Sequence, residues 1–390
     1  MSTGESSDEN NKNNNSEEDF DLFEVVVIGA GAAGIGAAIA LAHAGVEDFL
    51  LVERDFVGSS FASWPKETRF ITPSFPSNSI GMLDLNSISV GISPAFSMRV
   101  EHPTGQEFAE HLQSLTEYYG LPVSENTEIT SIEKIEEYFH LKTEDSTLLA
   151  KNVIWAAGEY QYPNLDIFEG SKICQHTATI DKYADLEGDD FLIIGGYESG
   201  IDAAYHLAKN DKKVRVFDND CPWAEESSDP SISLSTFSFE RIRDNSFIDN
   251  VKLYSETTVS SVIFNDEEYV LKTQNGEIFK SKTQPILACG FEGSHKFVSH
   301  LFEQREDGFP LLSENDESTI VPGMFLCGPS VRHDDHIFCF IFKYRQRFAI
   351  VAQAIASSLD LPTEEFVSMY RSWGMYLDDL SCCGQECLTC

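Results

Sequence analysis

The stretch that decides the fold is FEVVVIGAGAAGIGAAIALAHAG, residues 23–45. Its β-branched run, 25–28, has the length and composition of a buried parallel strand. That strand leads directly into Gly29-Ala-Gly31-Ala-Ala-Gly34, and an alanine-rich helix follows to about residue 45. Gly29 permits a tight turn, Gly31 lets a pyrophosphate approach the backbone, and Gly34 lets helix and strand pack closely. The pattern predicts a dinucleotide site with phosphates at the helix N-terminus.

The acidic residue that such a site needs follows at the expected spacing. Residues 49–52 form the next predicted strand, which ends in Glu53. An acidic side chain about 20 positions beyond the glycine turn binds the ribose hydroxyls of a dinucleotide. Glu53, with Arg54 beside it, is therefore assigned to this cofactor site.

The pattern recurs in the second half of the chain, with one departure. A strand over 191–194 leads into Gly195-Gly-Tyr197-Glu-Ser-Gly200, and a helix follows over 201–209. Tyr197 replaces the middle glycine, so a side chain occupies the point where a pyrophosphate would touch the backbone. The residues assigned to this second dinucleotide are Gly195, Glu198, Ser199 and Gly200.

The order of these segments resembles that of the two-dinucleotide-domain flavoproteins, which include thioredoxin reductases, bacilliredoxin-reductase-like proteins and flavin-containing monooxygenases. The resemblance runs from about 23 to 359 and includes the turns that close on Gly158, Gly290 and Gly328. It implies an α/β fold of FAD/NAD(P)-binding, Rossmann-like three-layer domains, with the nicotinamide domain inserted into the FAD domain. The expected parts are a disordered acidic tail (1–21), an FAD-binding domain (22–165 and 286–380), an NAD(P)-binding domain (166–285) and a Cys-rich tail (381–390).

The resemblance also implies the cofactors. FAD would occupy the first site, with Gly158, Gly328 and the loop residue Trp64 near it, and NAD(P)H would occupy the second. Asp218 ends the strand after the second helix. A carboxylate there hydrogen-bonds a free ribose 2′-OH and repels a 2′-phosphate, so NADH is favoured over NADPH. A solvated strand end without a cofactor role is the alternative. Many relatives carry an Asp after Gly328, and this chain has Pro329 instead.

The nine cysteines are placed unevenly, with none before Cys174. The sequence lacks the redox cysteine pairs that thioredoxin reductases and larger disulfide reductases carry beside their cofactors. A cluster at the chain end holds an adjacent pair and a CxxC, and such thiols form and exchange disulfides. We assign it as a redox tail; four thiolates at short spacing also suit a soft metal, and an inert end is the third alternative. The candidate catalytic residues are Cys382, Cys383, Cys387 and Cys390; no metal ligands are assigned.

Together these features predict hydride transfer from NAD(P)H to FAD and on to a small-molecule or protein disulfide. A flavin monooxygenase, a flavin thiol oxidase that ignores NAD(P)H, and a metal-binding tail on a vestigial flavin fold are the alternatives. His333-Asp-Asp-His336 would line the flavin with a histidine as proton donor, or would form a polar loop. The polar stretch around Trp223 and Ser231 is interpreted as a lid or interface segment.

Composition limits the partners. The chain has 64 acidic and 27 basic residues, a formal net charge of −37. Such a surface repels phosphate backbones and anionic lipid, so neither nucleic acid nor a membrane is an expected partner. The N-terminal stretch lacks the features of a secretory signal. We expect a cytoplasmic protein, with a homodimer suggested by the relatives.

Overall fold

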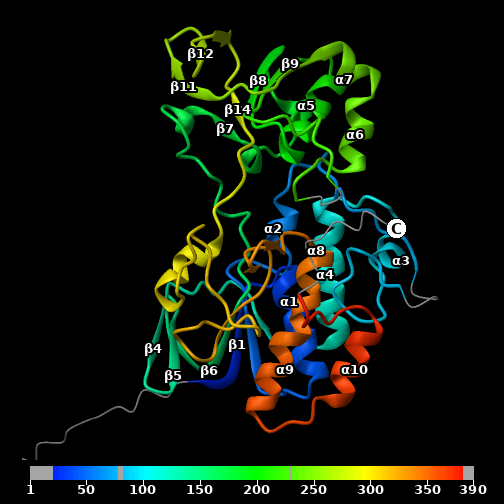
Figure 1. Ribbon diagram of the computed structural model, residues 1–390, viewed down its shortest axis with the longest axis vertical. Coiled ribbons are helices and arrows are strands. Elements are labelled where there is room, and N and C mark those ends of the chain that lie inside the picture. The colour runs from blue at the N-terminus through cyan, green and yellow to red at the C-terminus, as the bar shows by residue number, and fades with distance from the viewer. Residues whose placement is uncertain (1–20, 78–81, 228–230, 381–390) are drawn as a thin grey trace, which may run out of the picture.

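The computed structural model describes residues 21–77, 82–227 and 231–380. The predicted acidic and Cys-rich tails lie outside these ranges, apart from Asp21. Figure 1 shows two domains, a larger one that contains both ends of the described chain and a smaller one above it. Both combine parallel strands with helices, which confirms the α/β prediction.

The larger domain is built on a seven-stranded sheet. Its order is β3-β2-β1-β6-β5-β4, and β15 also pairs with β6. β1 lies between β2 and β6 and is parallel to both, while β5 and β4 continue the sheet antiparallel. The strands are β1 (Leu22–Ile28), β2 (Phe49–Val52), β3 (Val123–Ser124), β4 (Ser131–Ile135), β5 (Tyr138–Lys142), β6 (Thr147–Trp155) and β15 (Met324–Leu326).

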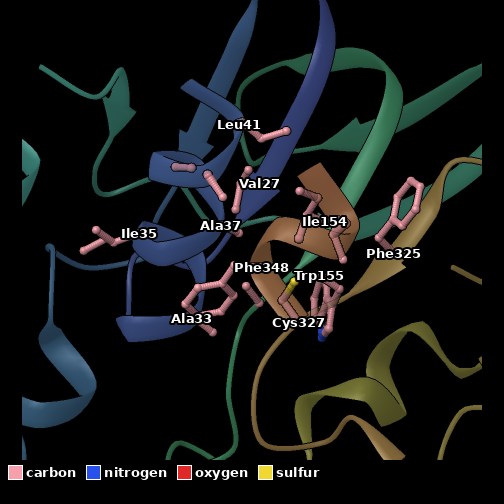
Figure 2. Packing of buried hydrophobic residues seen from close by; sticks show 14 of the residues in the cluster. Val27, Ala33, Ile35, Ala37, Leu41, Ile154, Trp155, Phe325, Cys327 and Phe348 are labelled. Carbon is pink, nitrogen blue, oxygen red and sulfur yellow. The ribbon is translucent and has the colours of Figure 1, made fainter. Parts of the chain in front are cut away.

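Helices that are distant in sequence pack together beside this sheet. Helix α1 packs against α9, and Phe348 at the start of α9 is fully buried. A Cβ atom at Gly36 of α1 would overlap the Phe348 ring, so this glycine permits the close approach seen in Figure 2. The helices of this domain are α1 (Ala32–His43), α2 (Ser59–Ala62), α3 (Pro94–Met98), α4 (Gly105–Tyr119), α8 (Ile341–Tyr344), α9 (Phe348–Ser358) and α10 (Glu364–Ser372).

The smaller domain has a parallel sheet of order β10-β9-β8-β14-β7. Alternate residues of its central strand face different layers, as strand geometry requires. Phe191 and Ile193 pack into the cluster that includes α5, whereas Leu192 and Ile194 pack against the three-stranded sheet β11-β12-β13. The elements are β7 (Gln175–His176), β8 (Asp190–Ile194), α5 (Glu198–Lys209), β9 (Lys213–Phe217), α6 (Thr236–Ile242), α7 (Asn245–Asn250), β10 (Val251–Tyr254), β11 (Val259–Phe264), β12 (Tyr269–Thr273), β13 (Ile278–Ser281) and β14 (Ile286–Leu287).

Two neighbouring linkers join the domains. Pro163 and Phe291 form an antiparallel bridge, and the Glu292 N–H donates to the Tyr162 carbonyl at 2.7 Å. The predicted return of the chain at residue 286 is therefore placed too early. Because β14 pairs in parallel with β8, Ile286 and Leu287 belong to the smaller domain, and the return follows Gly290.

Among the described residues, no helix combines the length and the apolar character that a membrane crossing requires.

Candidate functional site

A cavity of about 520 Å³ opens where β1, β2 and β6 end, and Ile28, Val52 and Trp155 line it. The carboxyl edge of a parallel sheet is the usual place for a ligand in this type of fold. Of the predicted site residues, Gly29, Gly31, Glu53, Arg54, Trp64, Gly158, Glu198 and Ser199 line the cavity, whereas Gly34, Gly195, Gly200, Asp218 and Gly328 do not.

Each of the three positions in the first turn is glycine for a different physical reason. Gly29 has φ +101°, and a Cβ there would lie 2.6 Å from the Ala156 carbonyl oxygen. A Cβ at Gly34 would overlap the Gly29 carbonyl oxygen. By contrast, a Cβ at Gly31 would meet no described atom within 4 Å. The first and third glycines therefore serve the fold, while the middle one leaves space beside the N-terminus of α1 for a ligand.

Glu53 connects the second strand to this turn. Its Oε2 accepts a hydrogen bond from the Ala30 N–H at 2.8 Å, and its Oε1 accepts one from the Asp55 N–H at 3.0 Å. The carboxylate is thus fixed at the cavity wall beside the glycines. Arg54 forms an ion pair with Asp55 at 3.0 Å, and because both side chains are well exposed the pair adds little stability.

Aromatic side chains form another part of the wall. Trp64 packs against Phe61 and Phe70, with ring centroids 5.3 and 4.9 Å away. Tyr160 also lies near Trp64, with ring centroids 6.4 Å apart, and burial raises the pKa of Tyr160. These rings give the cavity an apolar surface suited to a flat aromatic ligand.

Sequence interpretation missed many polar groups of the wall, among them Glu159, Cys339 and Tyr344. Glu159 follows the turn residue Gly158, which was the one available signal. Burial raises the pKa of Glu159, and the nearby Arg332 partly offsets this effect. Nothing in the local pattern around Cys339 or Tyr344 indicated that they would line the same cavity as Glu159.

The second turn has the same backbone frame as the first. Gly195 has φ +99°, and a Cβ there would overlap the Ala288 carbonyl oxygen. A Cβ at Gly200 would overlap the Gly195 carbonyl oxygen. Tyr197 caps α5 with φ −82°, which any residue adopts, and its hydroxyl donates to the Ser233 carbonyl at 2.9 Å.

Side chains of this domain cover the second turn. A Cβ at Gly196 would overlap the Trp223 ring. The Glu198 carboxylate accepts hydrogen bonds from the Ser235 N–H and the Ser238 hydroxyl, both at 2.5 Å. The part of the predicted lid that the structure describes therefore lies against the N-terminus of α5.

Asp218 occupies the place that Glu53 has in the first unit. Its Oδ2 accepts from the Gly196 N–H at 2.6 Å, and its Oδ1 accepts from the Asp220 N–H at 2.9 Å. Both carboxyl oxygens are therefore already bonded to backbone near the turn.

Of the two interpretations of residues 333–336, the structure agrees with the polar loop, because neither His333 nor His336 lines the cavity. His333 Nε2 lies 2.5 Å from Asp316 Oδ1, and Arg347 Nε donates to Asp316 Oδ2 at 3.0 Å. Asp316 is fully buried, so this network holds the 332–337 loop in place.

The tail cysteines Cys382, Cys383, Cys387 and Cys390 lie outside the described residues. The five described cysteines form no disulfide with one another. Cys327 is buried beside Trp155 in the core, as Figure 2 shows.

The architecture defines a two-domain protein with one dinucleotide-type turn in each domain. A family model described as Pyridine nucleotide-disulphide oxidoreductase matches residues 26–328, and the chain belongs to this family. Bacilliredoxin reductase Bdr of Bacillus subtilis is 24% identical over 313 residues, which cover 78% of this chain and 89% of Bdr.

One further sequence relative and one solved structure also match this chain. The oxidoreductase CzcO of Bacillus velezensis is 27% identical over 192 residues, 48% of this chain and 52% of CzcO, so the match spans about half the length of that relative. The solved structure of the bacillithiol disulfide reductase Bdr from Staphylococcus aureus aligns with TM-score 0.73 and 20% identity, covering 87% of this chain and 99% of that one. At this identity the likeness shows the fold, which confirms the predicted two-domain FAD/NAD(P) architecture.

Proposed function

We propose that this chain is an FAD-dependent oxidoreductase that takes hydride from NAD(P)H and reduces a disulfide substrate. The observation that carries the proposal is the cavity at the first turn, where Gly31 leaves open space between the α1 N-terminus and Glu53. Family membership supports the reaction class.

The residues present fit FAD. Unpaired N–H groups at the start of α1 suit its pyrophosphate, and no acidic side chain in the first turn of that helix would repel it. Glu53 would bind ribose, and Trp64 would contribute to the flavin pocket. When bound, FAD supplies hydride and electron transfer. Gly158 would place backbone, without a side chain, against the same group.

NAD(P)H is assigned to the second turn, with Gly195, Glu198, Ser199 and Gly200. Glu198 and Ser199 line the cavity, so the start of α5 faces the proposed FAD site. Asp218 supports a preference for NADH, because a carboxylate there disfavours a 2′-phosphate.

The proposal that the substrate is a disulfide rests on the relatives and on the Cys-rich tail. Bdr is named as a disulfide reductase, and the tail offers thiols that would relay electrons between flavin and disulfide. The proposal includes a cytoplasmic location and a homodimer.

A flavin thiol oxidase is the second candidate, and the covered second turn favours it. Tyr197 and Trp223 occupy space that a bound dinucleotide would need. A chain that keeps this turn closed would draw electrons from thiols and leave NAD(P)H unused.

An anaerobic titration separates the two candidates. The purified yellow protein is titrated with NADH and then NADPH, while flavin absorbance is followed and free thiols are counted. Bleaching with extra reductant consumed as new thiols form supports the disulfide reductase. Absence of bleaching by either nucleotide, with bleaching by dithiothreitol, supports the thiol oxidase. Bleaching without new thiols contradicts both and favours a monooxygenase.

A further inference from the structure

Two consecutive residues of the larger domain, Glu67 and Thr68, bond to the smaller domain. The Glu67 carboxylate accepts one hydrogen bond from the Tyr183 N–H and one from the Ala184 N–H, each at 3.1 Å. The Thr68 hydroxyl donates to Asp202 Oδ2 at 2.6 Å. These contacts fix both direction and distance between the domains. We refer to the two side chains, Glu67 and Thr68, as the interdomain clamp.

The groups that the clamp binds are firmly held within the smaller domain. Tyr183 begins a short 3-10 helix (Tyr183–Asp185), is 1% exposed, and packs in the same hydrophobic cluster as residues of α5. Asp202 lies in α5 and is also buried. Its carboxylate pairs with Arg241 of α6 and lies 3.3 Å from His206 Nε2. The clamp therefore binds the packed body of the smaller domain, rather than a surface loop.

On the other side, the clamp is continuous with the wall of the cavity assigned to FAD. Thr68 itself lines this cavity, as do its neighbours Trp64 and Phe70. The two aromatic rings pack together with centroids 4.9 Å apart, and the Phe70 N–H donates to the Pro103 carbonyl at 2.9 Å. Segment 64–70 is thus fixed to the larger domain at both ends. It connects the aromatic wall to α5.

The start of α5 reaches the same cavity through the residues next to Asp202. Glu198 and Asp202 are four positions apart, so they lie on one face of the helix, and both line the cavity together with Ser199. The lining is shared between the domains only while α5 stays where the clamp holds it. Relative motion is the default for two domains that meet through polar contacts and are joined by linkers.

We propose that Glu67 and Thr68 are positioning residues that hold the start of α5 against the cavity, in the arrangement needed for hydride transfer. The inference rests on the proposed function. In the step that it serves, the nicotinamide nucleotide is oxidised by loss of a hydride and the flavin is reduced by gaining it. Such a transfer requires reacting atoms about 3–3.5 Å apart, and a misplacement of about 1 Å can slow a reaction about 100-fold.

Amide hydrogen exchange tests the clamp without any turnover. The full-length protein with FAD bound and no nucleotide is compared with Glu67→Ala, and exchange is followed by mass spectrometry in peptides that contain residues 183 and 184. We expect these two amides to exchange about tenfold faster in the variant, because each loses a charged acceptor. Equal exchange in the two proteins would overturn the inference.

Lys66→Gln is the matched control for this experiment. Lys66 Nζ pairs with Asp181 across the same boundary at 2.6 Å, but both side chains are well exposed, so the pair adds little. The variant should exchange as the wild type does. Faster exchange in Lys66→Gln, equal to that in Glu67→Ala, would show that any loss of polar contact loosens this boundary and would overturn the assignment to Glu67.

Flavin reduction gives the second readout. Thr68→Val removes the hydroxyl that binds Asp202, whereas Thr68→Ser keeps it. Under anaerobic stopped flow with saturating NADH, Thr68→Val should reduce its flavin about 10- to 100-fold more slowly. Its FAD content and its Kd for NADH should be unchanged, and Thr68→Ser should recover the wild-type rate.

The outcomes of the two experiments are distinguishable. A wild-type rate in Thr68→Val, or an equal loss in Thr68→Ser, would overturn the positioning role. A wild-type flavin that NADH does not reduce would contradict the proposed use of NADH, while amide exchange would still decide whether Glu67 holds the two domains together.

Discussion

The two dinucleotide turns share a backbone conformation but differ in the side chains that lie over them. Gly29 and Gly195 have φ +101° and +99°, and the helix-capping residues Gly31 and Tyr197 have φ −85° and −82°. Because a φ near −80° suits any residue, the fold does not require glycine at the middle position. Gly31 keeps that space open to a ligand, whereas Tyr197 carries a side chain that reaches the Ser233 carbonyl. The first and last glycines are required by the fold, whereas the middle position affects only the space left for a ligand.

The helix starts differ in charge as well. The first turn of α1 holds no acidic residue, while α5 begins with Glu198. An anionic side chain at a helix N-terminus is favourable for the helix. The Ser235 N–H and the Ser238 hydroxyl hold this carboxylate in place, so a phosphate at the start of α5 would meet a fixed negative charge.

The largest effect on stability is expected at Asp202 of α5, which stands at the position that Gly36 has in α1. Asp202 is buried, forms an ion pair with Arg241, and accepts from the Thr68 hydroxyl of the larger domain at 2.6 Å. Asp202→Asn leaves the buried Arg241 charge uncompensated and should lower the free energy of unfolding by about 3–5 kcal/mol. Urea denaturation measures this loss, and a loss below about 1 kcal/mol would show the pair to be dispensable.

The same carboxylate has a defined pH dependence. Burial would raise the pKa of Asp202, but His206 at 3.3 Å, the Arg241 charge and the Thr68 hydrogen bond together lower it. A lowered folded-state pKa contributes stability that is present above the unfolded value of about 3.9 and is lost as pH falls through the folded value. The wild type should therefore lose its advantage over Asp202→Asn only in the acid range.

The next largest effect should be equal in the two turns. Gly34→Ala and Gly200→Ala each place a Cβ atom against a carbonyl oxygen of their own turn. Since backbone cannot swing aside as a side chain can, each should destabilise its domain by about 3 kcal/mol. Thermal unfolding monitored by circular dichroism measures both losses. If only one of the two substitutions destabilised the protein, the two turns would not be structurally equivalent.

Moving the tyrosine into the first turn tests the ligand role of Gly31. Gly31→Tyr should leave the fold intact and weaken FAD binding at least about 100-fold, or ~2.7 kcal/mol. FAD content after gel filtration is the measurement. Gly31→Ala is the graded control, with a smaller loss, and full FAD occupancy in the tyrosine variant would show that phosphate does not approach here.

The smallest effect is expected from opening the second turn. Tyr197→Gly combined with Trp223→Ala removes both covering side chains and should tighten NADH binding about tenfold, or ~1.4 kcal/mol. Isothermal titration with NADH and NADPH measures it, with Trp373→Ala in the other domain as control. Unchanged affinity would mean that these side chains move aside at no cost.

Local patterns carried most of the sequence prediction. The two strand–turn–helix units were recognisable because the glycine spacing and the strand residues are adjacent in sequence. Three features depend on tertiary packing: the pairing of His333 with Asp316, the cover that Trp223 provides over Gly196, and the presence of Cys339 in the cavity lining. No spacing rule relates such residues. The boundary near 286 was misplaced for a related reason, because the short strand β14 is defined by its partner β8 and not by its own composition.

The insertion of one domain into the other has a consequence for synthesis. The smaller domain is continuous, from the linker at 163 to the return after 290, whereas the larger one needs β15 and α9 to complete its sheet and core. Domains usually fold in order from the N-terminus as the ribosome releases them. Here the N-terminal domain cannot finish first, so its exposed β6 edge and the α1 surface must wait, unpartnered, until the last hundred or so residues emerge.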